Sequence, residues 1–478
     1  MNPFLCGDAF IQGTWISPVE GASIPITNPS SGTQISSCPM LSSEQVQEAI
    51  DSAEKAFLSW STVPAPKRGD LLMAWYDLII AHLEELAEIV TLENGKPLAE
   101  AKGEVRYTAS FVRWFGEEAR RIYGKEIPSN HAHQRILVRK EPVGVCGIIT
   151  PWNFPSAMLG RKLAAALAAG CTVVAKPSEE TPLSAFALAR LAQKAGIPDG
   201  VINLVTGEPA QIGLHFCTSP TIAKISFTGS TRVGRLLMEQ SGQRLQRLSL
   251  ELGGNAPFVV CADADIESAA QGLMNSKFRN CGQTCIASNR VLVHSSKQDV
   301  FLQAILPKIQ ELTVGDGFVE QTTLGPMINQ VAVQKIRVLV QDALDKGAGI
   351  LMGELPMDGS QFVSPIVLTG IESHMDVWNT EIFGPVVAVR TFEDDNHALR
   401  LANDTEYGLA AYVYTQGQKR SWMYSEKLKF GMIGVNTGRI STSQAPFGGV
   451  KQSGFGREGS WLGLDEYLSV KYTCLDLE

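Results

Sequence analysis

The sequence predicts an α/β fold in which strands and helices alternate around a parallel sheet. Apolar, β-branched runs such as VGVCGIIT (143–150) and CTVVAKP (171–177) are separated by helical stretches up to about residue 252. Strands that alternate with helices form parallel βαβ units. A second region with the same alternation runs from about 255 to 436. Because 478 residues are too many for one hydrophobic core, we expect at least two domains.

The first third of the chain is predicted to be helical. Ser42 and Gln45 form a capping-box start, after which apolar residues recur at helical spacing. A second helical stretch follows the segment PAP and carries LLMAWYDLIIAHLEELAEIV (71–90). Two further segments, ILVRKEPVG (136–144) and EYLSVKYTCLDL (466–477), have the strand pattern but no domain of their own. We expect them to pair as an arm with a neighbouring subunit.

Composition excludes several classes of partner. The net charge is −8 and there is no basic run, which disfavours nucleic acid and anionic membranes. The N-terminal MNPFLCGDAFIQG lacks the basic and apolar regions of a secretory signal. The longest nearly apolar stretch (163–175) is too short to cross a bilayer and predicts a buried helix running into a buried strand. Nine cysteines without framework spacing indicate free thiols in a reducing cytoplasm.

A structural metal is not expected. Cys281 and Cys285 have no second Cys/His pair at zinc-site spacing, and HExxH is absent. His131 and His133 are interpreted as a solvated pair in a loop.

One turn has the features of a phosphate-binding site. Gly229 and Ser230 follow the strand KISFT (224–228) and open a helix that contains Gly234. Backbone N–H groups at a helix start attract anions, and glycine permits close approach. The pattern is not GxGxxG, and an ordinary strand-to-helix turn is the better interpretation when nothing else agrees.

The strand ending at Lys176, with Glu179 three residues later, suggests contacts with a nucleotide ribose. A carboxylate in this position accepts hydrogen bonds from ribose hydroxyls and repels a 2′-phosphate, which favours NAD over NADP. The alternative is that Glu179 only complements the dipole of the following helix.

Two polar residues at strand ends are candidates for catalysis. Glu251 ends the strand RLSLE before two glycines, and its desolvation would raise its pKa towards general-base use. Alternatively it is a strand-end carboxylate held in a salt bridge. Asn153, between two prolines, could aim its amide at a developing oxyanion or be only a turn residue.

The segment FRNCGQTC (278–285) contains two candidate thiols. A cysteine nucleophile requires partial exposure and activation by a helix end or nearby charge. Gly282, Gln283 and Thr284 leave the backbone free to place the Cys285 thiol, whereas Cys281, one helical turn earlier, is more typical of a packing thiol. Spacing alone favours Cys285 over Cys281 as the nucleophile.

Seven segments in register resemble the aldehyde dehydrogenase superfamily across essentially the whole chain. They are TPWNFP (150–155), AAGCTVVAKPSEETP (168–182), ISFTGST (225–231), LELGGNAP (250–257), FRNCGQTC (278–285), EIFGPV (381–386) and APFGGVKQSGFGRE (445–458). The resemblance implies that Cys285 is the nucleophile, Glu251 the general base and Asn153 the oxyanion donor. It also matches Lys162 to a family lysine implicated in proton relay and site geometry.

The same resemblance implies an NAD site, with NADP possible. The matching cofactor-binding positions are Thr150, Pro151, Trp152, Lys176, Ser178, Glu179, Gly229, Ser230, Gly234, Leu252, Glu381 and Phe383. Glu381 would hold the nicotinamide ribose, and Phe383 would pack near the nicotinamide ring.

Within the superfamily the chain is most similar to succinate-semialdehyde dehydrogenases. The resemblance implies that Arg161, Arg279 and Ser441 bind a short ω-carboxylate and that Phe447 lines the substrate site. Two guanidiniums and a hydroxyl form a chemically sensible carboxylate clamp. Each arginine alone would be interpreted as a helix-surface charge, but the occurrence of both at matching positions favours the carboxylate clamp.

Three positions bear on how far the resemblance extends. Ala287 stands where some relatives carry a second, redox-active cysteine, so that switch is absent. Cys281 could replace it only near the outer limit of disulfide reach. Arg439, in the loop GRIST, stands where an apolar residue is usual, which puts the loop shape and the preferred chain length in question.

The expected reaction is NAD(P)-dependent oxidation of succinate semialdehyde to succinate through a thiohemiacetal and a thioester on cysteine. Glutarate semialdehyde, another ω-oxo acid or an aliphatic aldehyde are alternatives, because one methylene is worth only about 1–3 kcal/mol in a pocket. A non-catalytic structural protein that retains the fold is an alternative from another class. We expect a cytoplasmic homodimer or homotetramer with a small-molecule semialdehyde substrate and neither nucleic acid nor membrane as a partner.

The resemblance also implies a domain plan. We expect a discontinuous NAD-binding domain (1–122 and 145–252, to which 441–462 returns), a catalytic domain (253–440) and a β oligomerisation arm (123–144 and 463–478).

Overall fold

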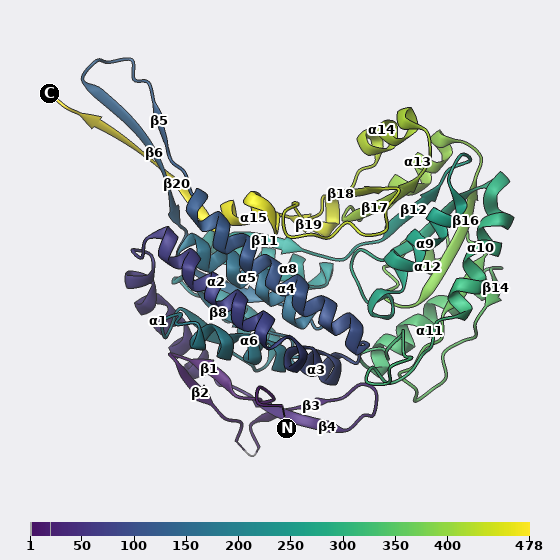
Figure 1. Ribbon diagram of the computed structural model, residues 1–478, viewed down its shortest axis with the longest axis horizontal. Helices are drawn as coiled ribbons and strands as arrows, with labels where there is room; N and C mark the ends of the chain where they lie inside the picture. Colours follow the sequence, from purple (N-terminus) through teal and green to yellow (C-terminus); the bar gives the residue numbers. More distant parts are fainter. Residues whose placement is uncertain (1, 20) are drawn as a thin grey trace.

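The computed structural model describes residues 2–19 and 21–478 and contains two large, mainly parallel sheets and a projecting arm (Figure 1). The first sheet has the strand order β19-β11-β10-β7-β8-β9-β1-β2. Its strands are β1 (Ala9–Ile11), β2 (Thr14–Ile16), β7 (Val145–Ile149), β8 (Thr172–Lys176), β9 (Ile202–Leu204), β10 (Ile222–Thr228), β11 (Arg247–Glu251) and β19 (Gly454–Phe455). The five strands from β11 to β9 are parallel, as the alternation of strands and helices predicts.

Helices pack around this first sheet. They are α1 (Ser43–Trp60), α2 (Ala65–Ala81), α3 (Leu83–Asn94), α4 (Leu98–Glu118), α5 (Pro155–Ala169), α6 (Leu183–Lys194), α7 (Pro209–Thr218) and α8 (Thr231–Ser241). The predicted capping box at Ser42 and Gln45 is confirmed. The stretch 71–90, however, is two helices, because His82 leaves helical geometry at φ −111° and ψ 28° between α2 and α3.

Helix α5 is the most enclosed element of this half. Every one of its residues is buried, and it packs against α2, α4 and α6 as well as β7 and β8. Its run LAAALAA has small side chains on all sides, which lets neighbouring helices approach closely. The expected buried helix leading into a buried strand is thus confirmed, and two functional candidates, Arg161 and Lys162, are fixed on its rigid backbone.

The second sheet has the order β14-β15-β16-β13-β12-β17-β18 and is parallel from β15 to β18. Its strands are β12 (Ala256–Val260), β13 (Ser288–His294), β14 (Gly349–Met352), β15 (Ile366–Thr369), β16 (Val386–Phe392), β17 (Ala410–Tyr414) and β18 (Met432–Val435). Its helices are α9 (Ile266–Lys277), α10 (Gln298–Gln310), α11 (Gln330–Asp345), α12 (Asp376–Asn379), α13 (Asp395–Asn403) and α14 (Gln418–Lys427). The second α/β region is therefore confirmed.

The two extended segments of the sequence pair with each other. Strand β20 (Leu468–Asp476) runs antiparallel to β6 (Gln134–Pro142), which also pairs with β5 (Lys125–Ile127). This three-stranded sheet projects from the body with the C-terminus at its tip (Figure 1). A short helix, α15 (Ser460–Asp465), leads into β20, and a separate hairpin is formed by β3 (Ser23–Thr27) and β4 (Gln34–Pro39).

None of the helices within residues 2–19 and 21–478 combines the length and apolar character needed to cross a membrane.

Candidate active site

Two adjoining cavities lie where the two large sheets meet. The inner one has a volume of about 580 Å³ and is lined by Cys285, Glu251 and Asn153. The outer one has a volume of about 390 Å³ and contains none of these three among its lining residues. Both cavities are lined by Tyr107, Phe154, Arg279, Thr284, Ile286 and Ser441. These shared walls make the outer cavity an approach to Cys285.

The loop that carries Cys285 is fixed by close backbone contacts. A side chain on Gly254 would lie 2.2 Å from the Cys285 carbonyl oxygen, so only glycine permits this approach between the two segments. Gly282, at φ +75°, would meet the Gly384 carbonyl oxygen at 2.3 Å in the same way. The result is a thiol held at the wall of the inner cavity, where Cys285 is partly exposed.

Cys281 lies in a different environment. The expectation that it precedes Cys285 by one helical turn is wrong, because Asn280 and Cys281 have φ values of 51° and 55°, outside any right-handed helix. Cys281 is instead 1% exposed and packs in an apolar cluster with Met327 and Ile336. Both thiols are free in the structure. The interpretation of Cys281 as a packing residue is consistent with this position.

The charges around Cys285 do not favour its thiolate in the free protein. Burial is the main cause that raises the pKa of the thiol to about 12, and the carboxylates of Glu381 and Glu251 raise it further. The guanidiniums of Arg161 and Arg279 act in the opposite direction. A thiol in this state needs a proton acceptor when it attacks a carbonyl group.

Glu251 is an unpaired carboxylate in the same cavity. It ends β11, is 2% exposed, and neither of its carboxylate oxygens has a hydrogen-bond partner among residues 2–19 and 21–478. Burial, followed by the charge of Glu458, raises its pKa well above the usual range of a glutamate. The alternative of a salt-bridged strand-end carboxylate is not what the structure contains.

Asn153 is held rigidly between β7 and α5. Its side-chain Nδ2 donates to the backbone carbonyl of Gln283 at 3.0 Å. The backbone carbonyl of Asn153 accepts from Lys96 Nζ and Asn280 Nδ2, both at 2.8 Å. An amide nitrogen carries two N–H bonds, so one remains for another acceptor. Asn153 is thus a preorganised donor in the wall shared with Cys285.

Arg161 and Lys162 share one buried carboxylate. Arg161 Nε and Lys162 Nζ both form ion pairs with Glu458, and Lys162 also donates to Ser226 Oγ at 3.0 Å. The Arg161 guanidinium lies 4.6 Å from the centre of the Phe447 ring, and both residues line the inner cavity. Lys162 is buried and does not line this cavity.

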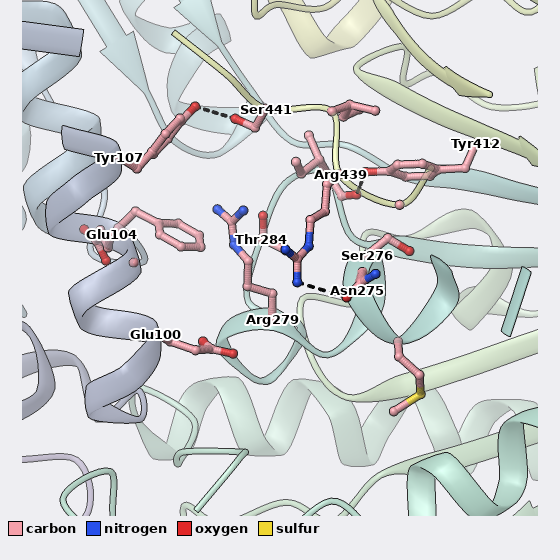
Figure 2. Close-up of a pocket in the computed structure, with 16 residues that line it drawn as sticks. Glu100, Glu104, Tyr107, Asn275, Ser276, Arg279, Thr284, Tyr412, Arg439 and Ser441 are labelled. Carbon is pink, nitrogen blue, oxygen red and sulfur yellow. Dashed lines mark hydrogen bonds between the residues drawn. The ribbon is translucent and has the colours of Figure 1, made fainter. Parts of the chain in front are cut away.

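Arg279 and Ser441 line both cavities, and Figure 2 shows their side chains in the outer one. Arg279 follows α9 and opens the irregular turn Arg279–Gly282, and its guanidinium lies 4.5 Å from the centre of the Phe154 ring. The Ser441 hydroxyl is hydrogen-bonded to the Tyr107 hydroxyl of α4, as Figure 2 shows. All four predicted substrate residues therefore line one cavity with Cys285, namely Arg161, Arg279, Ser441 and Phe447.

The predicted cofactor residues fall into two groups. Those that line the inner cavity are Pro151, Trp152, Gly229, Ser230, Leu252, Glu381 and Phe383. Those outside its walls are Thr150, Lys176, Ser178, Glu179 and Gly234, of which Lys176 ends β8 and pairs with Glu179 at 2.9 Å.

The first group fits a dinucleotide. Residues that follow the parallel strands β7, β10 and β11 line the cavity, and nucleotides bind at such carboxyl ends. Ser230 caps α8 by accepting from Val233 N–H at 3.3 Å. A side chain on Gly234 would lie 2.5 Å from Leu252 Cδ2, so glycine lets α8 pack closely on the end of β11. The carboxylate of Glu381 accepts from Gly254 N–H at 2.9 Å, and burial raises its pKa to about 7.

Comparison with known families decides the class of this site. Residues 15–473 match the aldehyde dehydrogenase family. The chain belongs to that family. The aldehyde dehydrogenase resemblance seen in the motifs and the expected fold are confirmed, and the protein is an enzyme that uses NAD(P).

Several characterised aldehyde dehydrogenases are similar over nearly the full length. The mitochondrial succinate-semialdehyde dehydrogenase of Arabidopsis thaliana is 50% identical over 97% of this chain and 88% of its own length. A glutarate-semialdehyde dehydrogenase of Pseudomonas aeruginosa is 45% identical over 98% of this chain and 97% of its own. The crystal structure of succinate-semialdehyde dehydrogenase from Burkholderia pseudomallei superposes with a TM-score of 0.97 at 47% identity, covering 99% of this chain and 98% of that one.

Three groups in this aldehyde dehydrogenase site had no role predicted from sequence. Glu458 ends a recognisable motif, but a single charge in a loop carries no periodic signal. Tyr107 looks like an ordinary helical residue of α4, and only the fold brings it to Ser441. The buried pair of Lys96 and Glu104, 2.6 Å apart, supports Asn153 and the first turn of α5, where Glu104 accepts from the Ser156 N–H at 2.9 Å.

Proposed function

We propose that the protein oxidises succinate semialdehyde to succinate with NAD as the hydride acceptor. The observation that carries this proposal is the single cavity in which Cys285 shares walls with Arg161, Arg279 and Ser441. Two guanidiniums and a hydroxyl bind a carboxylate, and a substrate held there presents its aldehyde to the thiol.

The first step joins the Cys285 sulfur to the aldehyde carbon. The thiol proton leaves as the S–C bond forms, and Glu251 is the candidate acceptor because its carboxylate is unpaired and its pKa is raised. The negative charge that develops on the aldehyde oxygen is stabilised by the Asn153 amide and the backbone N–H of Cys285. Removing one such donor costs on the order of 3 kcal/mol of transition-state stabilisation.

The second step releases the acid. A bound NAD, with Glu381 at its ribose and Phe383 near its ring, would supply the hydride acceptor, and the acyl group would remain on Cys285 as a thioester. Once Glu251 has released the first proton to solvent, its carboxylate takes a proton from water and the hydroxide oxygen attacks the thioester. The S–C bond then breaks, and the Cys285 thiolate takes up the proton of the acid, which leaves the carboxylate and the free thiol. Arg161 and Arg279 hold the distal carboxylate through both steps.

Glu179 supports NAD as the preferred cofactor. Its carboxylate is partly exposed and paired with Lys176 at the end of β8, where a ribose is expected. A 2′-phosphate next to this carboxylate would be repelled.

Glutarate semialdehyde is the second candidate substrate. Its support is the relative of that name together with the outer cavity, which leaves room beyond Ser441. A purely structural role has less support, because Cys285, Glu251 and Asn153 are all present and share one cavity.

We also propose a cytoplasmic homodimer or homotetramer. All nine cysteines are free, which suits a reducing compartment. Strand β20 exposes Val470 and Tyr472, at 68% and 62%, which suits burial against another subunit.

The test is an NADH-absorbance assay with four- and five-carbon ω-oxo acids and butanal, each with NAD and NADP. We expect kcat/KM to be highest for the four-carbon acid with NAD, because only an ω-carboxylate uses both arginines. Equal kcat/KM for butanal would contradict the substrate class. Cys285→Ala should abolish turnover while retaining NADH binding, and Cys281→Ala is the matched control that should remain active.

A further inference from the structure

Three arginines face the two cavities at different depths. Arg161 lines only the inner cavity, beside Cys285, and Arg279 lines both. Arg439 lines only the outer cavity. Figure 2 shows Arg279 and Arg439 extending into the same space, with Ser441 and Tyr107 on its other side. A carboxylate can therefore meet a guanidinium at more than one distance from the thiol.

Packing fixes the position of Arg439. It lies in the loop after β18, where its N–H donates to Thr437 Oγ1 at 3.2 Å. A side chain on Gly438 would lie 2.2 Å from the Gly272 carbonyl oxygen, so this loop sits directly on α9. Arg439 Nη2 then donates to Asn275 Oδ1 of that helix at 3.2 Å. These contacts direct the guanidinium along the wall of the outer cavity.

The charge of Arg439 is not neutralised by its surroundings. Arg161 is paired with Glu458, and Arg279 has Glu100 as a neighbouring charge. In contrast, within residues 2–19 and 21–478 Arg439 has no carboxylate within 4 Å, and its side-chain partner is the neutral Asn275. Glu104, the other acid of this cavity, is already paired with Lys96. Within the described part of the chain, the guanidinium of Arg439 therefore remains an unpaired cationic donor in the wall of the outer cavity.

We propose that Arg439 is a specificity-determining residue that binds the carboxylate of ω-oxo acids longer than four carbons. This proposal rests on the proposed function. A four-carbon acid places its carboxylate at the inner arginines, and each added methylene moves that carboxylate outward, past Ser441 and towards Arg439. The chain is thereby suited to several lengths of semialdehyde rather than one.

The experiment compares Arg439→Leu with wild type on four-, five- and six-carbon ω-oxo acids and on hexanal. We expect kcat/KM for the six-carbon acid to fall about three- to fivefold, as for an exposed ion pair, mainly through KM. The four-carbon acid and hexanal should change by less than about twofold, and added salt should shrink the difference between the enzymes. Arg439→Lys should retain part of the effect, because it keeps the charge but loses the planar fork.

Arg400→Leu is the matched control, since Arg400 is an exposed arginine of α13 outside both cavities. Inhibition of four-carbon turnover by a six-carbon dicarboxylate gives a second readout, and Arg439→Leu should weaken it by a similar factor. If Arg439→Leu loses kcat/KM equally for all three acids, or loses none for the six-carbon acid, the proposed role of Arg439 is overturned. The proposed function is not affected by either result. If wild type oxidises hexanal as efficiently as every ω-oxo acid, the proposed function fails and this inference fails with it.

Discussion

Cys281 and Cys285 differ in what surrounds them rather than in their chemistry. The left-handed backbone at Asn280 and Cys281 turns the first thiol into the apolar cluster, and Gly254 lets the second approach the cavity wall. Of the two, only Cys285 lines the inner cavity. Its position follows from backbone geometry that neighbouring glycines permit.

The pH dependence of Cys285 alkylation follows from its pKa of about 12. Because burial raises this pKa, the thiolate is scarce at neutral pH and its fraction increases as pH rises. We expect the rate of iodoacetamide modification in the free protein to increase about tenfold per pH unit between about pH 6 and 9. Peptide mass spectrometry of the segment containing Cys285 measures this rate.

Cys281→Ala is the control, and it should show the same pH dependence at Cys285. A plateau in the rate near pH 7 would show that the free protein already stabilises the thiolate, contrary to the charges around it.

At the scale of elements, the segment before α15 ties the buried helix α5 to the rest of the site. Glu458 pairs with two cations of α5, and its backbone exchanges hydrogen bonds of 2.8 Å with Phe447. The same segment therefore positions Arg161 and the Phe447 ring beneath it. Breaking this contact should affect both stability and substrate binding.

Glu458→Gln should lower the free energy of unfolding by about 3 kcal/mol at neutral pH, because it leaves two buried cations without a counter-charge. Arg161 and Lys162 lower the pKa of Glu458 in the folded state. The stabilisation is therefore present above the pKa of the unfolded glutamate and is lost as pH falls through the lower folded-state pKa. Urea unfolding should show that the difference in unfolding free energy between wild type and Glu458→Gln is smaller at acidic pH than at neutral pH.

Glu406→Gln is the matched control for a surface pair. Glu406 lies 3.1 Å from Arg235 at an exposed site, so we expect its loss to cost less than about 1 kcal/mol. If Glu458→Gln and Glu406→Gln lower the free energy of unfolding by similar amounts, the buried ion pairs of Glu458 contribute no more stability than a surface ion pair.

At the scale of the whole molecule, the projecting arm carries apolar side chains that no other part of the same chain covers within residues 2–19 and 21–478. Strands β5, β6 and β20 project from the body (Figure 1). Large apolar side chains of β5 and β20 are exposed to solvent. Val470 and Tyr472 lie two residues apart and so share one face of β20. A partner subunit covering this face would bury both.

Replacing Val470 and Tyr472 together by glutamate should convert the proposed homo-oligomer to smaller species, because burying two new charges at an interface is unfavourable. Light scattering coupled to size exclusion measures the mass. Thr473→Glu places one charge on the opposite face and is the control. An unchanged mass for the double variant would exclude this face from the interface.

Much of the site was predictable because its residues belong to contiguous motifs. Glu251, Asn153 and Cys285 each lie in a short, characteristic segment. The parallel first sheet brings Asn153, after β7, and Glu251, at the end of β11, to one edge, and Cys285 reaches them from the loop before β13 of the second sheet. Tyr107 and Glu458 escaped prediction because their partners, Ser441 and Arg161, lie hundreds of residues away in the chain. The break at His82 was also missed, since the apolar pattern continues across it.

The sequence by itself determined the α/β class, the strand series and the family and predicted Cys285 as the candidate thiol, because each depends on local pattern or on motifs read in order. The tertiary structure alone decided which charges are paired and how deep each one lies. Arg161, Arg279 and Arg439 are alike as residues, and only packing separates them into an inner, a shared and an outer position. Burial and distance set the strength of an electrostatic interaction, and neither can be deduced from the order of residues in a chain.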